Sequence, residues 1–102
     1  MLFYKLRWSR NMFDLTNKVV LLTGATGGIG KSIAKKMKEK GAKLILSGTR
    51  QNILNELSSE LGDNTKAIAT DLTSKESILS LAKEAECFFG HIDILINNAG
   101  IT

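Results

Sequence analysis

A glycine-rich turn at residues 23–30, hereafter the glycine loop, is the part of the chain best suited to bind a ligand. It reads Thr-Gly-Ala-Thr-Gly-Gly-Ile-Gly, follows a short apolar run and precedes an amphipathic one. Backbone N–H groups in such a turn and the positive end of the following helix dipole both attract a phosphate group. Glycine costs backbone entropy unless another group must approach closely, so four glycines within residues 24–30 favour a phosphate site over a plain turn.

Each position of the glycine loop has an expected role. Gly24 permits the tight turn, Gly28 removes a side chain that would block a diphosphate, and Gly30 lets the helix pack close to the preceding strand. The hydroxyl groups of Thr23 and Thr26 can fix the loop through hydrogen bonds. The spacing Gly-x-x-x-Gly-x-Gly differs from the usual dinucleotide spacing Gly-x-Gly-x-x-Gly, so the loop alone does not settle which nucleotide binds.

A second phosphate-binding interpretation competes with the first. The tripeptide Gly30-Lys31-Ser32 matches the end of an ATP-binding P-loop. A strict P-loop has glycine where this chain has Ala25, and Asp71 is the only candidate for the accompanying carboxylate. We therefore rank ATP binding second.

Apolar and amphipathic runs alternate along the chain and predict an α/β fold. Short apolar runs predict strands, and apolar residues that recur every three or four positions predict helices. The predicted strands are 19–22, 44–46, 66–70 and 92–96, and the predicted helices are 28–40, 51–61 and 73–89, with apolar faces that include Ile29, Ile33, Met37, Ile53, Leu54, Leu57, Leu61, Ile78, Leu81, Ala85, Phe88 and Phe89. Helices between successive strands imply parallel pairing, hence a Rossmann-type doubly wound parallel sheet with strand order 3-2-1-4.

Composition restricts the chain to one domain and excludes several classes of protein. The chain has 102 residues, 43% of them hydrophobic, which is too apolar for intrinsic disorder. No apolar run approaches the roughly 20 residues that span a membrane. The single cysteine, Cys87, excludes an internal disulfide or a four-cysteine zinc site, and it is expected to be a packed thiol. We expect neither a membrane nor a metal partner.

The net charge of +4 comes mainly from the first residues. Residues 1–11 contain three basic residues among apolar ones, and we expect them to form an extension with no packed role. The family resemblance described in the next paragraph implies that residues 12–102 are the N-terminal part of an NAD(P)-binding Rossmann domain. A further group of lysines lies on or beside one predicted helix without interleaved aromatic residues, which favours a solvated helix face over a nucleic-acid interface.

Three motifs together resemble the short-chain dehydrogenase/reductase family. The glycine loop, the pair Asp71-Leu72 and the segment Asn97-Asn98-Ala99-Gly100 are similar to that family's cofactor loop, adenine-pocket pair and NNAG motif, in the same order. The resemblance implies that Asp71 accepts the adenine amino group and that Leu72 packs on the ring, although Asp71 also fits a plain turn before a helix. Within the family the chain most resembles the bacterial 3-oxoacyl-[acyl-carrier-protein] reductases. That resemblance implies NADPH-dependent reduction of a 3-oxoacyl thioester in fatty-acid synthesis.

The end of the second predicted strand favours NADP over NAD. NAD enzymes place an acid there to bind the ribose 2′-hydroxyl, whereas this chain has Ser-Gly-Thr-Arg at residues 47–50. Arg50 can pair with a 2′-phosphate, and Ser47 and Thr49 can donate hydrogen bonds to it. Arg50 also fits an ordinary exposed charge at a helix start, and similar reductases often carry a basic residue where this chain has Gly27. The predicted cofactor-binding residues are Gly24, Thr26, Gly27, Gly28, Ile29, Gly30, Thr49, Arg50, Asp71, Leu72, Asn98, Ala99 and Gly100.

The resemblance assigns no catalytic residue to this chain. The family's Ser and Tyr-x-x-x-Lys would lie beyond Thr102, and Tyr4, the only tyrosine, lacks a lysine at position 8. We therefore expect a fold truncated after the fourth strand, with that strand as an apolar edge and no activity alone. The alternative is a non-catalytic nucleotide-binding fragment that takes NADP or ATP. For a complete enzyme the resemblance implies an acyl-carrier-protein-linked substrate, a homo-oligomer and a cytoplasmic location.

Overall fold

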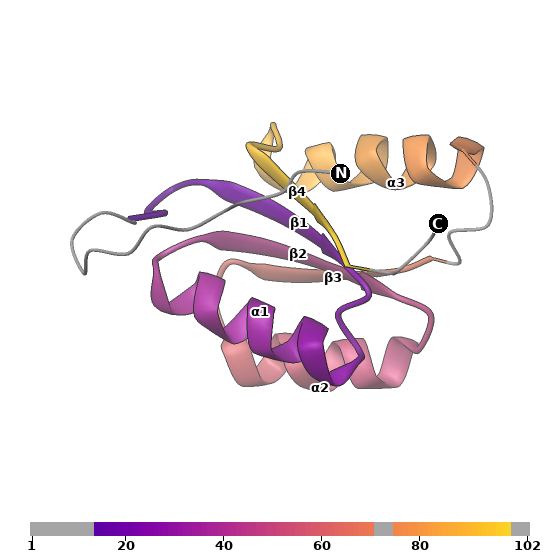
Figure 1. Ribbon diagram of the computed structural model, residues 1–102. Helices are drawn as coiled ribbons and strands as arrows, with labels where there is room; N and C mark the ends of the chain where they lie inside the picture. Colours follow the sequence, from indigo (N-terminus) through magenta and orange to yellow (C-terminus); the bar gives the residue numbers. More distant parts are fainter. Residues whose placement is uncertain (1–13, 71–74, 99–102) are drawn as a thin grey trace.

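Strands and helices alternate along the chain in the computed structural model, which describes residues 14–70 and 75–98 (Figure 1). The strands are β1 (Val19–Thr23), β2 (Lys43–Gly48), β3 (Thr65–Ala69) and β4 (Ile94–Asn97), and the helices are α1 (Gly28–Glu39), α2 (Gln51–Leu61) and α3 (Lys75–Phe89). The strands pair in parallel in the order β3-β2-β1-β4, with β4 at one edge of the described sheet. This arrangement confirms the predicted Rossmann-type fold.

Helices cover both faces of the sheet. In Figure 1, α1 and α2 lie on one face and α3 lies on the other. Alternate residues of β1 therefore enter two different cores, with Val20 and Leu22 in the core of α1 and α2 and Val19 and Leu21 in the core of α3. Every residue of β1 is buried, which explains why its sequence is continuously apolar instead of alternating.

The buried face of α1 differs from the predicted one. Its buried residues are Gly30, Ala34 and Met37, which form one stripe along the helix, and Ile33 packs beside them. Ile29 was predicted on this stripe, but 71% of it is exposed at the first turn of the helix. The prediction was wrong because the small residue Gly30, and not the apolar Ile29, packs against the backbone of Gly24 and Ala25 at the end of β1.

The apolar face of α3 is also only partly buried. Leu81 and Ala85 pack against the sheet, whereas Ile78 and Phe88 remain 36% and 40% exposed. α3 is the one helix on this face in the described part of the chain, so residues flanking its central stripe lack a neighbouring helix to cover them. Cys87 is exposed on this helix, so the expectation of a packed thiol was wrong.

Strand boundaries shift by one or two residues from the predicted ones. Ser47 and Gly48 were expected to end the second strand, but they belong to β2 because they continue its parallel ladder with β3. β3 begins at Thr65, one residue earlier than predicted, and β4 begins at Ile94 instead of Ile92. The predicted extension at residues 1–11 and the predicted start of the third helix at Thr73 lie outside the described residues.

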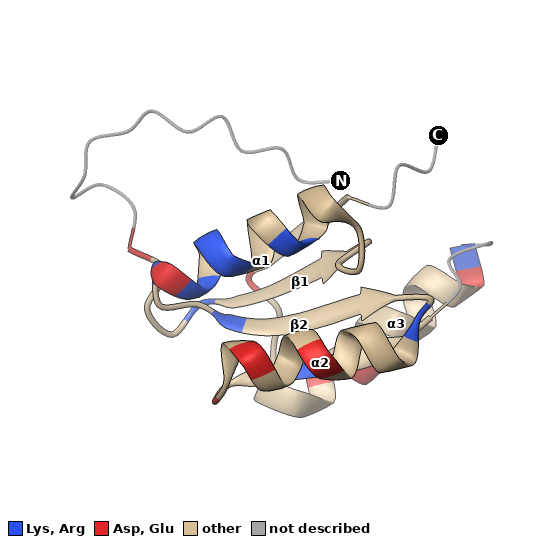
Figure 2. Ribbon diagram, turned by 90° about the horizontal axis from the view of Figure 1, so that it is seen from below, with Lys and Arg blue, Asp and Glu red and all other residues tan. Residues whose placement is uncertain are grey.

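Most charged residues of α1 and α2 are exposed. Figure 2 shows lysines on α1 and glutamates on α1 and α2, while the loop between β1 and α1 carries no charged residue. Lys35 of α1 pairs with Glu60 of α2 at 3.3 Å, with both side chains more than half exposed, so the pair adds little stability. Within residues 14–70 and 75–98, no helix combines the length and apolar character of a membrane span.

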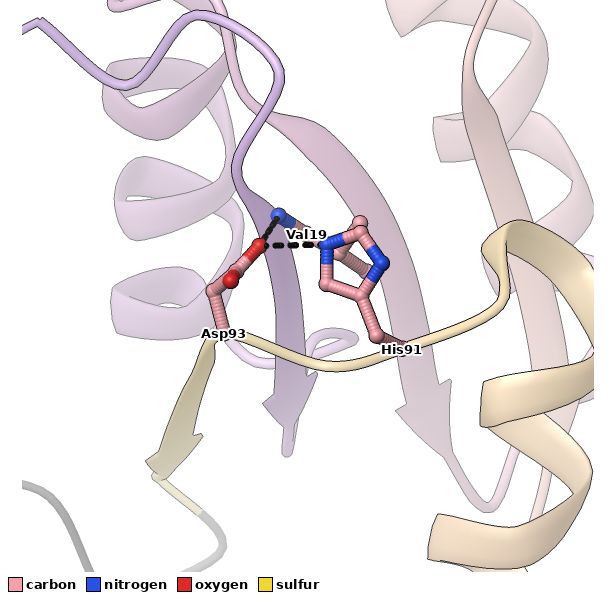
Figure 3. Close-up of polar contacts among 3 residues, drawn as sticks. All are labelled: Val19, His91 and Asp93. Carbon is pink, nitrogen blue, oxygen red and sulfur yellow. Dashed lines mark hydrogen bonds and ion pairs between the residues drawn. The ribbon is translucent and has the colours of Figure 1, made fainter.

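The start of β1 is joined to the start of β4 through Asp93 (Figure 3). The Asp93 N–H donates to the Val19 carbonyl at 2.9 Å, and its carboxylate accepts the Val19 N–H at 2.8 Å. The His91 Nε2 atom lies 2.9 Å from the same carboxylate oxygen. The hydrogen bond from Val19 is the main cause that lowers the pKa of Asp93, and the His91 contact adds to it.

We expect Asp93→Ala to lower the midpoint of thermal unfolding by several degrees at neutral pH. The substitution leaves the Val19 N–H without its carboxylate partner. Because folding lowers the pKa of Asp93, its stabilising effect is present above the ordinary aspartate pKa and is lost as the pH falls through the lower, folded value. Unfolding curves of the wild type and the variant should therefore converge in strong acid.

The matched control for this experiment is Glu56→Ala, which removes an exposed carboxylate from α2. Its unfolding midpoint should follow that of the wild type at every pH. An Asp93→Ala variant as stable as the wild type at neutral pH would contradict the role of Asp93.

Candidate functional site

An open hollow of about 370 Å³ lies where the carboxyl ends of β1, β2 and β4 meet the start of α1. Residues from the glycine loop, the β2–α2 turn and the end of β4 line it, namely Gly24, Thr26, Gly27, Gly28, Ile29, Gly30, Arg50 and Asn98. All eight belong to the predicted cofactor-binding set. The structure thus brings together residues from three separate segments of the chain.

Other predicted site residues fall elsewhere. Thr49 is exposed but does not line the hollow. Asp71, Leu72, Ala99 and Gly100 lie outside the described residues. Ser47 was expected to donate a hydrogen bond to the ligand, but it is fully buried in the sheet, and its hydroxyl has no hydrogen-bond partner among the described residues. That expectation was wrong because a side chain buried there has no access to the open hollow.

The glycines of the loop serve two different purposes. Gly24 has a φ of +66°, a conformation that glycine adopts at low cost. A Cβ atom on Gly30 would lie 2.1 Å from the Gly24 carbonyl oxygen, so this glycine is required for close packing of α1 on the loop. A Cβ atom on Gly28 would meet nothing within 4 Å, and one on Gly27 would meet only the Gly24 oxygen at 3.9 Å. Packing within the protein therefore does not require glycine at these two positions. The missing side chain of Gly28, at the first position of α1, keeps the hollow open there.

The N-terminus of α1 is suited to an anion. Its N-cap residue, Gly27, supplies no side-chain hydrogen bond, and the first turn contains no acidic residue. The Lys31 N–H donates to the Gly27 carbonyl at 2.9 Å, so the N–H groups of residues 28–30 have no acceptor within the helix. These N–H groups and the helix dipole together favour a phosphate in the hollow.

The end of β1 is tied to the end of β4 beside the hollow. The Thr23 hydroxyl donates to the Asn97 Oδ1 atom at 2.9 Å and accepts the Asn98 N–H at 3.0 Å. The Asn98 side chain also donates to the Gly24 carbonyl at 3.3 Å. Asn97 thus bonds to the Thr23 side chain and Asn98 to the backbone of Gly24, and these bonds hold the first turn of the glycine loop in place.

Arg50 is the one cation among the described residues that line the hollow, and none of those residues is acidic. Its guanidinium group donates to the Thr26 carbonyl at 3.4 Å, so it lies along the rim of the glycine loop. Arg50 is exposed, and a guanidinium has five N–H donors, so it can bind a second anionic group at the same time. The lining is therefore suited to an anion, and within residues 14–70 and 75–98 it offers no carboxylate, histidine or tyrosine to transfer a proton.

Comparison with known proteins identifies similar sequences. The family model described as short chain dehydrogenase matches residues 18–102. The nodulation protein G of Rhizobium sp. (strain N33) is 44% identical over 91 residues, which is 89% of this chain and 37% of that protein. A 3-oxoacyl-[acyl-carrier-protein] reductase of Vibrio cholerae serotype O1 is 47% identical over 89 residues, 87% of this chain and 36% of that protein.

A solved structure shares the fold. A 3-ketoacyl-(acyl-carrier-protein) reductase from Brucella melitensis, crystallised in complex with NADH, superposes with a TM-score of 0.75 and 32% sequence identity. The match covers 80% of this chain and 34% of that chain. The present chain therefore spans little more than a third of the length of the relatives it matches.

Alanine substitutions should separate the two kinds of glycine. Gly28→Ala places a methyl group in the hollow without a clash, so we expect unchanged thermal stability but roughly tenfold or greater loss of affinity for a nicotinamide dinucleotide. Gly30→Ala forces the methyl group onto the Gly24 carbonyl, so we expect a stability loss of about 1–3 kcal/mol. Calorimetric titration and thermal unfolding measure the two effects. A Gly28→Ala variant that binds the dinucleotide as tightly as the wild type would contradict this assignment.

Proposed function

Because this chain belongs to the short-chain dehydrogenase family, we propose that it binds a nicotinamide dinucleotide in the hollow and serves in an oxidoreductase. The observation that carries the proposal is the uncapped N-terminus of α1 facing an open space at Gly27 and Gly28. A dinucleotide fits these groups, since the N–H groups of residues 28–30 supply donors for its diphosphate. The bound cofactor would supply or accept a hydride.

The proposed orientation of the cofactor follows from the strand order. In parallel sheets of this kind a dinucleotide crosses the carboxyl ends of the strands at the point where the order reverses, here between β1 and β4. In this proposal the glycine loop would hold the diphosphate, Arg50 would hold the adenosine ribose, and Asn98 would lie on the nicotinamide side. Thr23 and Asn98 hold the loop and β4 together at this place.

Within this proposal we favour NADP over NAD. Arg50 is available at the rim, and no acid among the described lining residues would repel a 2′-phosphate. ATP is the weaker candidate because Lys31 and Ser32, which carry the P-loop resemblance, do not line the hollow. Glycine at position 27 leaves Arg50 as the one cation in the described lining, so the preference for NADP rests mainly on this residue.

The proposed reaction of the whole protein is reduction of a 3-oxoacyl-[acyl-carrier-protein] to the 3-hydroxyacyl form. The support is that relatives with 43% and 47% identity carry the name of this reductase, as does the similar solved structure. The proposal includes an acyl-carrier-protein-linked substrate, a role in fatty-acid synthesis in the cytoplasm and a homo-oligomeric enzyme. Within it, the present residues hold the cofactor.

A second candidate is a nucleotide-binding module without catalytic activity. The described part of the chain contains no tyrosine, and its hollow contains no group that would protonate a carbonyl oxygen. This observation favours nucleotide binding as the contribution of the present residues, whichever protein they serve.

Substitution of Arg50 tests the choice of cofactor. Arg50→Gln keeps a polar N–H group at this position but removes the charge that would pair with a 2′-phosphate. We expect about a tenfold loss of NADPH affinity and little change for NADH, because an exposed hydrogen bond to a charged group contributes about 1.5 kcal/mol. Equal losses for both nucleotides would contradict a role in recognising the 2′-phosphate.

Gly27→Arg is the complementary variant, because it adds a cation to the hollow that could replace the charge of Arg50. Gly27 has φ −80° and ψ 168°, which any residue adopts, and a Cβ atom there would meet only the Gly24 carbonyl oxygen, at 3.9 Å. In the Arg50→Gln background it should restore part of the lost NADPH affinity.

A chimera tests the proposed reaction. Residues 18–102 would replace the matching segment of the Vibrio cholerae reductase, and NADPH oxidation with a 3-oxoacyl thioester would be followed by absorbance. We expect kcat/KM within about tenfold of the parent enzyme, since the present residues contribute binding and not proton transfer. A control chimera with Gly28→Ala should lose activity. A folded chimera that binds NADPH but does not turn over would instead support the module without catalysis.

A further inference from the structure

The end of β2 holds the glycine loop at three neighbouring points. The Ala25 N–H donates to the Ser47 carbonyl at 2.9 Å. The side chain of Thr26 lies directly over Gly48. The Arg50 guanidinium donates to the Thr26 carbonyl at 3.4 Å. Residues 47–50, which include the proposed ribose-binding Arg50, are therefore joined to the glycine loop mainly through Thr26.

Gly48 is an unusual residue for its place in the fold. It is buried within β2 and pairs with Ala69 of β3, and glycine in a strand weakens it. Its φ lies outside the left-handed range, so the backbone conformation does not require glycine. The requirement comes from space instead. A Cβ atom there would lie 3.0 Å from Thr26 Cγ2 and 3.3 Å from Thr26 Oγ1, while its distance of 3.6 Å to Leu54 is an ordinary contact.

We propose that Gly48 is a positioning residue for nucleotide binding, because its missing side chain lets Thr26 rest on β2 and thereby sets the position of the glycine loop. This inference rests on the proposed function, since a dinucleotide is the ligand for which the loop is positioned. It differs from the role of Gly30, where a Cβ atom would strike backbone that cannot yield. At Gly48 the neighbour is a side chain, so the fold can form while the loop shifts.

The consequence for binding is specific. A methyl group on Gly48 would push Thr26 outward by a few tenths of an ångström. The Thr26 carbonyl would move with it, and so would the point at which Arg50 is held. Affinity for both NADH and NADPH should fall, with NADPH affected more because Arg50 and the loop are both displaced.

A cycle of variants in the full chain tests this contact. Gly48→Ala, Thr26→Ala and the double variant are compared with the wild type by calorimetric titration of NADPH and NADH and by thermal unfolding. We expect Gly48→Ala to weaken both nucleotides by roughly 3–10-fold with a cooperative unfolding transition retained. In the Thr26→Ala background the same substitution should have no further effect, because the methyl group then has space. In the Gly48→Ala background, Thr26→Ser, which removes only Cγ2, should restore part of the lost nucleotide affinity.

Three results would overturn the proposal. These are wild-type affinity in Gly48→Ala, a loss that persists in the double variant, and unfolding of Gly48→Ala, which would assign Gly48 to the fold alone. Amide chemical shifts of residues 26–30 in the nucleotide-free protein give an independent readout. Gly48→Ala should shift these signals, and the double variant should match Thr26→Ala. If the wild type binds neither nucleotide, the proposed function fails, and these shifts still decide whether Gly48 sets the loop position.

Discussion

The close approach of α1 to the end of β1 is the constraint on which the candidate site depends. Gly30 lies so near the Gly24 carbonyl that no side chain fits between them. This contact directs the N-terminus of α1 at the space between β1 and β4, where the strand order reverses. Without it, the free N–H groups of the first helical turn would not face the hollow.

The strands around β1 hold this geometry in place. On one side, Thr23 and Asn98 join the loop to β4, and on the other, Ser47 and Arg50 join it to β2. At the opposite end of β1, Asp93 joins Val19 to the start of β4. β1 is thus fixed at both ends as well as buried on both faces. A rigid central strand is a suitable base for a loop that must present backbone groups accurately.

The sequence predicted the fold and all the described residues that line the hollow, and its errors have common physical causes. The alternation of strand-like and helix-like runs predicted the strand order, because short connections through helices allow few parallel arrangements of the strands. The predicted buried face of α1 was wrong at Ile29 because a hydrophobic pattern gives no weight to glycine, whereas the close packing of this helix requires the smallest residue. The burial of Ser47 and the exposure of Cys87 were not predicted, because whether one side of a sheet or helix is buried depends on which neighbouring elements cover it.

The sequence alone determined the order of elements, the glycine loop and the lack of an acid at the end of β2, because these depend on local residue types and spacing. Tertiary structure decided that Arg50 lies on the rim with Thr26, that Asn98 reaches Gly24 and that Gly48 receives the Thr26 side chain. Such contacts join residues more than twenty positions apart, and only the packing of neighbouring strands brings them within reach. Composition and the spacing of residues along the chain do not show which of these distant residues lie close together in space.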